Sequence, residues 1–380
     1  MKDRRMDSIL LAAVIFLCLL GVLMVYSSSA ILAMVEASSQ TAYVRSFLPK
    51  LALGWIALAA LSRISHFHFR GRLAWLALGI VLVGLVLVML PGLSTGGRGT
   101  RRFLDLGPFS AQPAEFARVA LVLFLASFVA HRERWAESGW KGLSWPLAAI
   151  FVTAGLVLVQ PNLSSAALIV MLGFGLLFLA GQPVYRLALA ALPGAIGVLL
   201  LEPYQLERVR QFWVHQSGGA SSYQVQQSLI AVGSGGFFGK GLGEGLQKYL
   251  YLPFPHTDFI LAVIGEELGF IGMLVLFTLF GVVIYRGLRI ARLASDPFSQ
   301  LLAAGITLNL AVNVFLHAFV VLGLGPVTGV PLPFISHGGS SLMVNLAAVG
   351  ILLSISRSVR PRSVPIRTAP NIMRRPSRAM

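Results

Sequence analysis

The residues with the clearest potential for chemistry lie where a polar segment, 202–256, meets the long apolar run Phe259–Tyr285. His256, Thr257 and Asp258 occupy this junction. A carboxylate there is predicted at the mouth of a membrane protein, in the first turn of a helix. Ionisable side chains at membrane depth are costly, so each is a functional hypothesis by default. Asp258 is therefore the candidate catalytic residue, and the alternative is a helix cap, because Asp is favoured in a first turn.

Small residues follow Asp258 along one predicted helical face, at spacings of three and four positions. They are Ala262, Gly265, Gly269 and Gly272. Because small side chains let another helix approach the backbone closely, Asp258 is expected to face the protein interior or a cavity. Glu266 and Glu267 add two more carboxylates to a helix that needs none for crossing a bilayer.

The composition is that of a polytopic membrane protein. The chain is 56% hydrophobic and 12% charged, with a mean hydropathy of +0.80, which excludes an ordinary soluble domain. About ten apolar runs are expected to span the membrane. They are Ile9–Tyr26, Phe47–Leu61, Leu73–Leu90, Phe116–Ala130, Trp145–Val159, Ser164–Ala180, Val184–Leu201, Phe259–Tyr285, Leu301–Leu324 and Leu342–Ile355.

The distribution of Lys and Arg predicts the orientation. With both termini in the cytoplasm, the inner segments hold an excess of basic residues, as the positive-inside rule requires. Asp258 and the large loop 202–256, between helices seven and eight, then face outward. The net charge of +16 is spread over loops and a tail, so we expect contact with anionic lipid headgroups and no nucleic-acid binding. Cys18 is the single cysteine, which excludes a disulfide framework.

A first polar cluster on the predicted outer side contains Arg101 and Arg102, beside several glycines. Arginine forks fit phosphate oxygens, so this pair is a candidate phosphate site, with lipid-headgroup contact as the alternative. Glu115 and Arg118 follow, three residues apart, and can pair on a helix. Such a pair is commonly structural.

A second cluster is the glycine-rich segment 233–243 around Lys240. It resembles a nucleotide P-loop only superficially, since Ser234 replaces the first glycine, Gly241 replaces the Ser/Thr, and no strand precedes it. Glycines still let backbone amides approach an anion, and Lys240 adds a point charge. A plain flexible loop is the alternative.

A third cluster, Gly329–Ser341, contains two prolines and two adjacent glycines within apolar sequence, together with Ser336 and Ser340. These residues cannot continue a helix, so the backbone polar groups must be satisfied within protein or in a wet cavity.

Other polar residues suggest structure more than catalysis. Asn309, Asn313 and His317 recur every four positions, a stripe that predicts hydrogen bonds between helices. His66 and His68 lie in a basic loop and are interpreted as solvated. We find no His/Glu spacing for zinc and no Ser-His-Asp arrangement that stands out.

In this order the motifs resemble the SEDS family (shape, elongation, division and sporulation), which includes the FtsW and RodA proteins of the bacterial cell wall. The resemblance covers nearly the whole chain. The motifs are Arg101-Arg102 before Leu106-Gly107-Pro108, Gln112-Pro113 with Glu115, Tyr223 and Gln227-Ser228, Gly239-Lys240-Gly241, His256-Thr257-Asp258-Phe259 with Gly265-Glu266-Glu267, Pro331–Ser336, and Gly338-Gly339-Ser340-Ser341. Several features, among them Gln247-Lys248 and Tyr251-Leu252-Pro253, look more like the division (FtsW) branch, whereas Val330–Pro333 looks more like the elongation (RodA) branch. We favour the division branch.

The resemblance implies an all-α polytopic protein with the SEDS fold, in the bacterial inner (plasma) membrane. It implies a peptidoglycan glycosyltransferase that polymerises lipid II, with a class B penicillin-binding protein and other divisome or elongasome proteins as partners. Asp258 matches the family's essential aspartate, and we expect it to act as general base on the acceptor hydroxyl, with inversion. The candidate substrate-binding residues are Arg101, Arg102, Glu115, Arg118, Lys240, His256, Thr257, Ser336 and Ser340.

Two rival functions remain open: a lipid II flippase, and a non-catalytic scaffold for a penicillin-binding protein. A divalent ion, Mg²⁺ or Mn²⁺, could share the phosphate charge, although the sequence shows no ligand cage for one. Two departures from the family pattern remove carboxylates, at Asn162 and Phe254. We expect one transmembrane domain, 1–356, and a basic, disordered cytoplasmic tail, 357–380.

Overall fold

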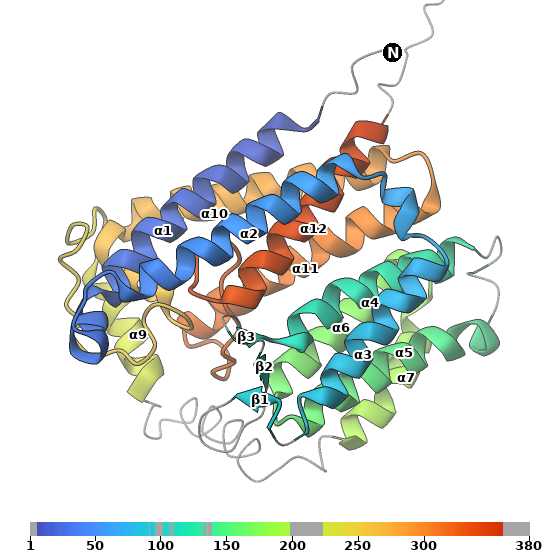
Figure 1. The fold of residues 1–380 in the computed structure, drawn as a ribbon, viewed down its shortest axis with the longest axis horizontal. Helices are drawn as coiled ribbons and strands as arrows, with labels where there is room; N and C mark the ends of the chain where they lie inside the picture. The colour runs from blue at the N-terminus through green and yellow to red at the C-terminus, as the bar shows by residue number, and fades with distance from the viewer. Residues whose placement is uncertain are drawn as a thin grey trace, which may run out of the picture.

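The computed structural model describes residues 6–90, 92–95, 102–105, 107, 110–131, 135, 139–197 and 223–359. Ten helices in these ranges coincide with the ten predicted apolar runs (Figure 1). They are α1 (Ser8–Ala37), α2 (Ala42–Arg63), α3 (Arg72–Leu87), α4 (Pro113–Ala130), α5 (Gly139–Val159), α6 (Leu163–Leu179), α7 (Val184–Gly197), α10 (Ile260–Leu293), α11 (Pro297–Val321) and α12 (Gly339–Ser358). Seven described helices are long and apolar enough to cross a membrane, and α3 and α6 are shorter apolar helices. The all-α membrane architecture is confirmed.

Smaller elements lie between these helices. A helix within the predicted polar loop, α9 (Tyr223–Ser234), packs beside α10. Strands β1 (Ser94–Thr95), β2 (Phe103–Asp105) and β3 (Ser110–Ala111) form an antiparallel sheet in the order β1-β2-β3, with Leu104 opposite both Ser94 and Ala111. The sequence predicts no strand here, because strands of two or three residues are too short to show alternation.

The connection between α2 and α3 corrects one interpretation. It contains the 3₁₀ helix η1 (His66–Phe69). His66 is buried, and its Nε2 lies 2.8 Å from the Ser299 hydroxyl, so this histidine is not solvated as predicted. His68 is exposed.

Asp7 joins three helices at one end of the bundle. Its carboxylate caps α1 by accepting a hydrogen bond from the Leu10 amide at 3.0 Å, and it pairs with Arg286 near the end of α10 at 2.6 Å. The Asp7 amide donates to the Ser356 hydroxyl of α12 at 3.2 Å. The beginning of α1 and the ends of α10 and α12 therefore lie together.

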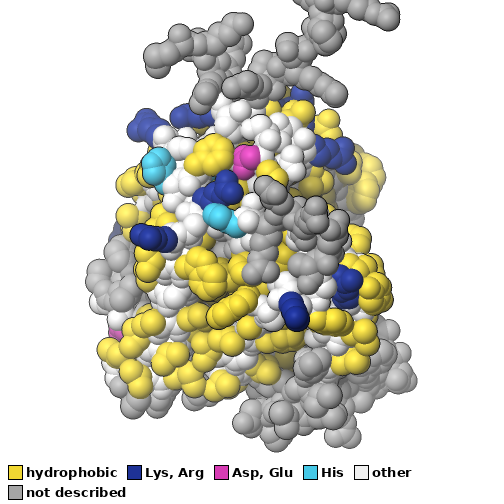
Figure 2. Space-filling model, turned by 90° about the vertical axis from the view of Figure 1, so that its right-hand side faces the viewer, with side chains coloured by type: hydrophobic (Ala, Val, Ile, Leu, Met, Phe, Trp, Pro, Cys, Tyr) yellow, Lys and Arg dark blue, Asp and Glu magenta, His cyan; other side chains and the backbone are white. Residues whose placement is uncertain are grey.

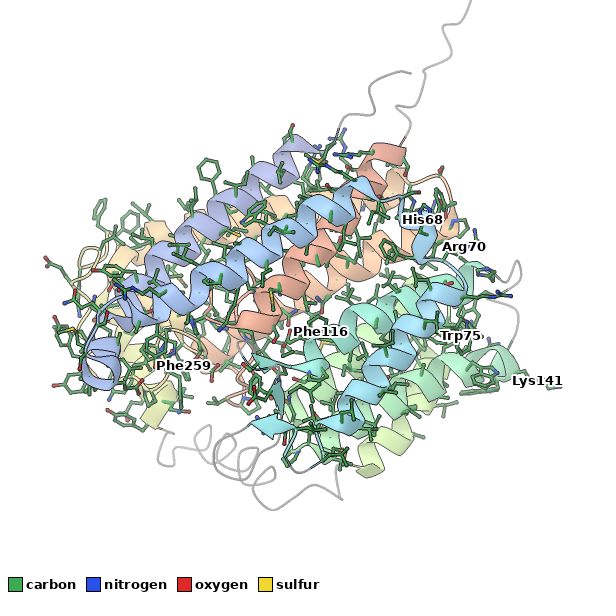
Figure 3. All side chains as sticks on the ribbon, viewed as in Figure 1. His68, Arg70, Trp75, Phe116, Lys141 and Phe259 are labelled. Carbon is green, nitrogen blue, oxygen red and sulfur yellow. The ribbon has the colours of Figure 1, made fainter. Side chains whose placement is uncertain are left out.

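The beginning of α10 lies at the other end of the bundle. A helix of 34 residues spans roughly 50 Å at 1.5 Å per residue. Figure 3 shows Phe259, just before α10, far from Arg70 and Lys141. Figure 2 looks onto the end that carries the α2–α3 connection, where Lys and Arg side chains are scattered over the surface. The structure thus separates Asp258 from this basic end.

Helices α2 and α12 pack along most of their length (Figure 1). A Cβ added to Gly54 would lie 2.5 Å from the Leu346 side chain, and one added to Gly350 would lie 2.7 Å from the Leu58 carbonyl oxygen. Only glycine permits helices to approach so closely at these positions. Helix α12 ends at Ser358, next to the predicted domain end at 356, and beyond Val359 the predicted tail lies outside the described residues.

Helix α10 is kinked at Gly269, whose φ of 64° and ψ of −162° interrupt the helix. The loop 235–241, which follows α9, supplies hydrogen-bond partners on both sides of the kink. The backbone bonds run from Phe270 to Gly236, from Ile271 to Phe237, from Lys240 to Glu266 and from Gly241 to Glu267, at 3.0–3.2 Å. The predicted small-residue stripe therefore receives α9 at Gly265, where Val232 is the neighbour, and a loop at Gly269.

Candidate active site

Asp258 lies in a turn immediately before α10. The helix begins at Ile260 with Phe259 as its N-cap, so Asp258 precedes the helix and is not in its first turn as predicted. Thr257 and Asp258 are half-buried, while Phe259 is completely buried. A buried aromatic side chain thus anchors the turn and leaves the neighbouring carboxylate partly accessible.

The segment 322–338, which links α11 to α12 and which we call the connector, holds this turn. The His337 amide donates to the His256 carbonyl at 2.9 Å, and the Ser336 hydroxyl donates to the Thr257 carbonyl at 2.8 Å. Ser336 also accepts from the Leu332 amide at 2.9 Å. The connector therefore meets the predicted need for internal hydrogen bonds and lies against the backbone on which Asp258 is carried.

The connector also approaches Asp258 from the side of Gly329. A Cβ built on Gly329 would lie 3.6 Å from Asp258 Oδ2. Behind this glycine, His317 Nδ1 of α11 lies 2.8 Å from the Val330 carbonyl oxygen, which fixes the connector to the bundle core. The position of Asp258 is thus determined from α10 and from the connector.

Two imidazoles and a phenol line one side of the turn. The His256 and Tyr43 ring centroids are 4.5 Å apart, those of His256 and His337 are 5.7 Å apart, and His337 Nε2 lies 2.8 Å from the Ser46 hydroxyl. Burial lowers the pKa of His256 to about 4. Burial, followed by the charges of Lys50 and His256, lowers the pKa of His337 to about 4. Both rings are therefore neutral near pH 7.

Ser340, predicted to bind substrate, is buried and bonded to protein. Its hydroxyl accepts from the Gln112 amide at 2.9 Å and lies 3.3 Å from the Ser110 carbonyl oxygen. It therefore holds β3 against the beginning of α12, an arrangement that favours a positioning role.

Glu115 and Arg118 form the predicted ion pair, and both are buried within the bundle. Arg118 also donates to Asn313 Oδ1 at 2.5 Å, and Asn313 donates to the Asn309 carbonyl at 2.8 Å. Asn309 and Asn345 of α12 lie 3.5 Å apart. The predicted polar stripe of α11 thus takes part in hydrogen bonds between helices, and the Glu115–Arg118 pair belongs to the same network.

The predicted phosphate-binding residues Arg101, Arg102 and Lys240 do not share one environment in the structure. Arg102 donates to the carbonyl oxygens of Gln160 and Pro161 and so links β2 to the turn between α5 and α6. Arg101 lies outside the described residues. Lys240 is 2.8 Å from Glu266 Oε1, an acidic partner that the sequence does not predict.

Glu267, the neighbour of Glu266 in α10, forms a buried ion pair with Lys248. Lys248 is 2.7 Å from Glu267 Oε1, and the Ser27 hydroxyl of α1 donates to the same carboxylate at 2.6 Å. Glu266 additionally accepts from the amides of Leu246 and Gln247. The two extra carboxylates of α10 therefore fasten the segment 240–248 to α1 and α10. Among the described residues no three His, Cys, Asp or Glu side chains converge as a metal-ligand set.

Lys50 is not among the site residues predicted from the sequence, and the structure places it at the beginning of α12. A Cβ built on Gly339 would lie 2.7 Å from Lys50 Cδ and 3.2 Å from its Nζ. A signal was present, because Lys50 is the single charged residue in the apolar run Phe47–Leu61.

Comparison with known proteins agrees with this architecture. A model of the FtsW/RodA/SpoVE family, described as a cell cycle protein, matches residues 8–361. Stage V sporulation protein E of Bacillus subtilis is 37% identical over 94% of this chain and 99% of its own length. A probable peptidoglycan glycosyltransferase FtsW of Trichlorobacter lovleyi is 36% identical over 93% of this chain and 94% of its own length.

Solved structures show the same fold. A chain from a structure described as the structural coordination of polymerization and crosslinking by a peptidoglycan synthase complex superposes with a TM-score of 0.74. It is 29% identical and covers 93% of this chain and 98% of its own. RodA of Thermus thermophilus superposes with a TM-score of 0.69 at 26% identity, covering 94% of this chain and 98% of its own. The chain belongs to the FtsW/RodA/SpoVE family.

Proposed function

We propose that this chain is a peptidoglycan glycosyltransferase that polymerises lipid II, with Asp258 as its general base. One observation carries the assignment of the base: Asp258 is a half-buried carboxylate on a turn held by both α10 and the connector. Family membership and relatives named as peptidoglycan glycosyltransferases support the reaction class.

The proposed step is a displacement at the anomeric carbon of the donor sugar. The Asp258 carboxylate takes the proton of the acceptor 4-hydroxyl, whose oxygen then forms the new glycosidic bond. The bond to the lipid pyrophosphate breaks with inversion, and its electron pair leaves with the pyrophosphate. A positioned general base typically contributes about 10²–10⁴-fold. The hydrogen bonds to His256 and Thr257 support this role, because they restrict the backbone that carries the base.

The decisive test uses purified protein and lipid II in detergent, where no membrane exists to cross. Glycan polymer made by wild type and absent with Asp258→Asn, at equal folding, supports the enzyme and its base. Lipid II binding without polymer by wild type would favour the flippase, and neither binding nor polymer would favour the scaffold. Normal polymerisation by Asp258→Asn would remove the general-base assignment alone.

The orientation is also a proposal: the end with Asp7 and Lys141 faces the cytoplasm of the plasma membrane, and Asp258 faces outward. The exposed basic residues Arg70, Arg72 and Lys141 support this, as the positive-inside rule expects. Cys18, the single cysteine, is buried, so new cysteines can be labelled selectively. In whole cells a membrane-impermeant maleimide should label Leu246→Cys and spare Lys141→Cys. The reverse pattern would invert the topology.

We further propose a class B penicillin-binding protein as partner. The support is the superposition on a chain from a peptidoglycan synthase complex that coordinates polymerization and crosslinking. Co-purification of the chain with a transpeptidase from its own organism, and faster polymerisation by that complex, is the expected result. A chain that polymerises equally fast alone would argue against functional coupling.

A further inference from the structure

Lys50 is a basic residue two turns inside a membrane-length helix, and it has no acidic partner among the described residues. It is half-buried, and the nearest basic neighbour in α2, Arg45, is exposed in the first turn. An ammonium group in such a helix is costly, because a bilayer offers little solvation. Among the described residues no ion pair with Lys50 offsets this desolvation cost.

Three other basic residues of the outer and central regions have acidic partners. Lys240 is paired with Glu266, Lys248 with Glu267, and Arg118 with Glu115. Each of these pairs compensates its own charge, and two of them fasten outer segments to α10. Lys50 therefore differs from them in having a charge that remains available to an anion.

The surroundings of Lys50 place its side chain beside Gly339 and His337. Tyr43, Phe47 and Lys50 follow one face of α2, and Ser46 lies beside them. This face contacts the connector: Phe47 and His337 ring centroids are 5.9 Å apart, and Ser46 bonds to the same imidazole. The far end of the Lys50 side chain packs against Gly339, where a larger residue would collide with it.

The same connector joins Lys50 to the catalytic turn. His337, whose pKa the charge of Lys50 helps to lower, donates through its amide to the His256 carbonyl, two residues before Asp258. Ser336 binds the Thr257 carbonyl. The turn that carries the proposed base and the helix face that carries Lys50 thus both contact the connector.

We propose that Lys50 is a substrate-contacting residue that binds the pyrophosphate of the lipid-linked sugar. This inference rests on the proposed glycosyltransferase function and replaces Lys240 in the role expected from the sequence. As the glycosidic bond forms and the bond to pyrophosphate breaks, negative charge grows on the leaving phosphate oxygens. The Lys50 ammonium donates hydrogen bonds to these oxygens, where a fixed cation stabilises the developing charge.

Binding tests this proposal without turnover. Asp258→Asn protein in detergent is titrated with undecaprenyl pyrophosphate and with undecaprenol, which has the same chain and no phosphate. Lys50→Gln should weaken pyrophosphate binding by about ten- to a hundredfold, the effect of losing a charged hydrogen bond, and leave undecaprenol binding unchanged. Lys50→Arg should retain most of the preference. Lys141→Gln, an exposed lysine at the basic end, is the matched control and should change neither.

Equal preference for the pyrophosphate in Lys50→Gln and its parent would overturn the proposal, whatever the outcome for Asp258. A second measurement needs no variant at Lys50 and so does not depend on its folding. Undecaprenyl pyrophosphate should protect Lys50, and not Lys141, from acylation by an amine-reactive reagent, as read by mass spectrometry, while undecaprenol should protect neither. Acylation of Lys50 that is unaffected by the pyrophosphate lipid would contradict the contact.

Discussion

The His337 amide donates a hydrogen bond to the His256 carbonyl at 2.9 Å, joining the connector before α12 to the turn before α10. This bond and its neighbour from Ser336 to Thr257 hold the backbone of the proposed base without using the base itself. Such an arrangement restricts where the carboxylate can lie, because the backbone that carries it is held in place. The connector should therefore influence catalysis as strongly as many residues that touch substrate.

Ser336→Ala is expected to lower the polymerisation kcat more than it changes KM. The buried Ser336 hydroxyl satisfies both the Thr257 carbonyl and the Leu332 amide, and leaving a buried group unsatisfied costs about 1–3 kcal/mol. Ser144→Ala is a suitable control, since that exposed hydroxyl donates to the Lys141 carbonyl within its own helix. A change in KM alone would instead indicate direct substrate contact by Ser336.

Acidification should destabilise the protein through His256 and His337. The pKa of each is about 4 in the folded protein, against about 6.5 in an unfolded chain. Between these values the unfolded state binds more protons, so stability holds above about pH 6.5 and falls as the pH drops toward 4. Thermal unfolding in detergent should show this loss. The double variant His256→Gln/His337→Gln should show a flatter pH dependence, and an unchanged one would contradict the assignment.

The helices could be predicted from the sequence, but the ion pairs between segments could not. Long apolar runs predict spanning helices because burial in lipid imposes a length and a composition. The partner of Lys240 lies 26 residues away and that of Lys248 lies 19 residues away, a separation that no periodicity of the sequence links. A lysine beside glycines therefore suggested an anion site, although its charge is compensated by Glu266.

Within the site, the turn at Asp258 and the motif containing Ser336 could both be identified from the sequence. Their contact could not, because it joins segments 79 residues apart through a hydroxyl and a carbonyl oxygen. Lys50 was visible as the single charge in an apolar run, but its significance depends on Gly339, which is far away in the chain.

Glu267→Gln should destabilise the protein more than most surface changes. The carboxylate is buried with Lys248 and Ser27, so its removal leaves a buried ammonium unpaired, at a cost of about 3–5 kcal/mol. The double variant Lys248→Met/Glu267→Gln removes both charges and should recover part of this loss. Unfolding of the wild type, both single variants and the double variant gives the coupling energy. Additive effects would show that the two side chains do not stabilise each other.

Gly269→Ala should be severely disruptive, and Gly281→Ala in the same helix should not. At Gly269 the positive φ disfavours any side chain, and a Cβ would lie 2.3 Å from the Gly239 backbone nitrogen. The change must therefore expel the loop 235–241 from the kink, with loss of its hydrogen bonds to α10. At Gly281 no atom lies within 4 Å of the added Cβ, and Ala is preferred over Gly in a helix by about 1 kcal/mol.

Hydrogen exchange of the loop amides measures the difference directly. Fast exchange at Gly239, Lys240 and Gly241 in Gly269→Ala, with slow exchange in Gly281→Ala, is expected, whereas equal protection in both variants would mean that the kink and the loop are independent.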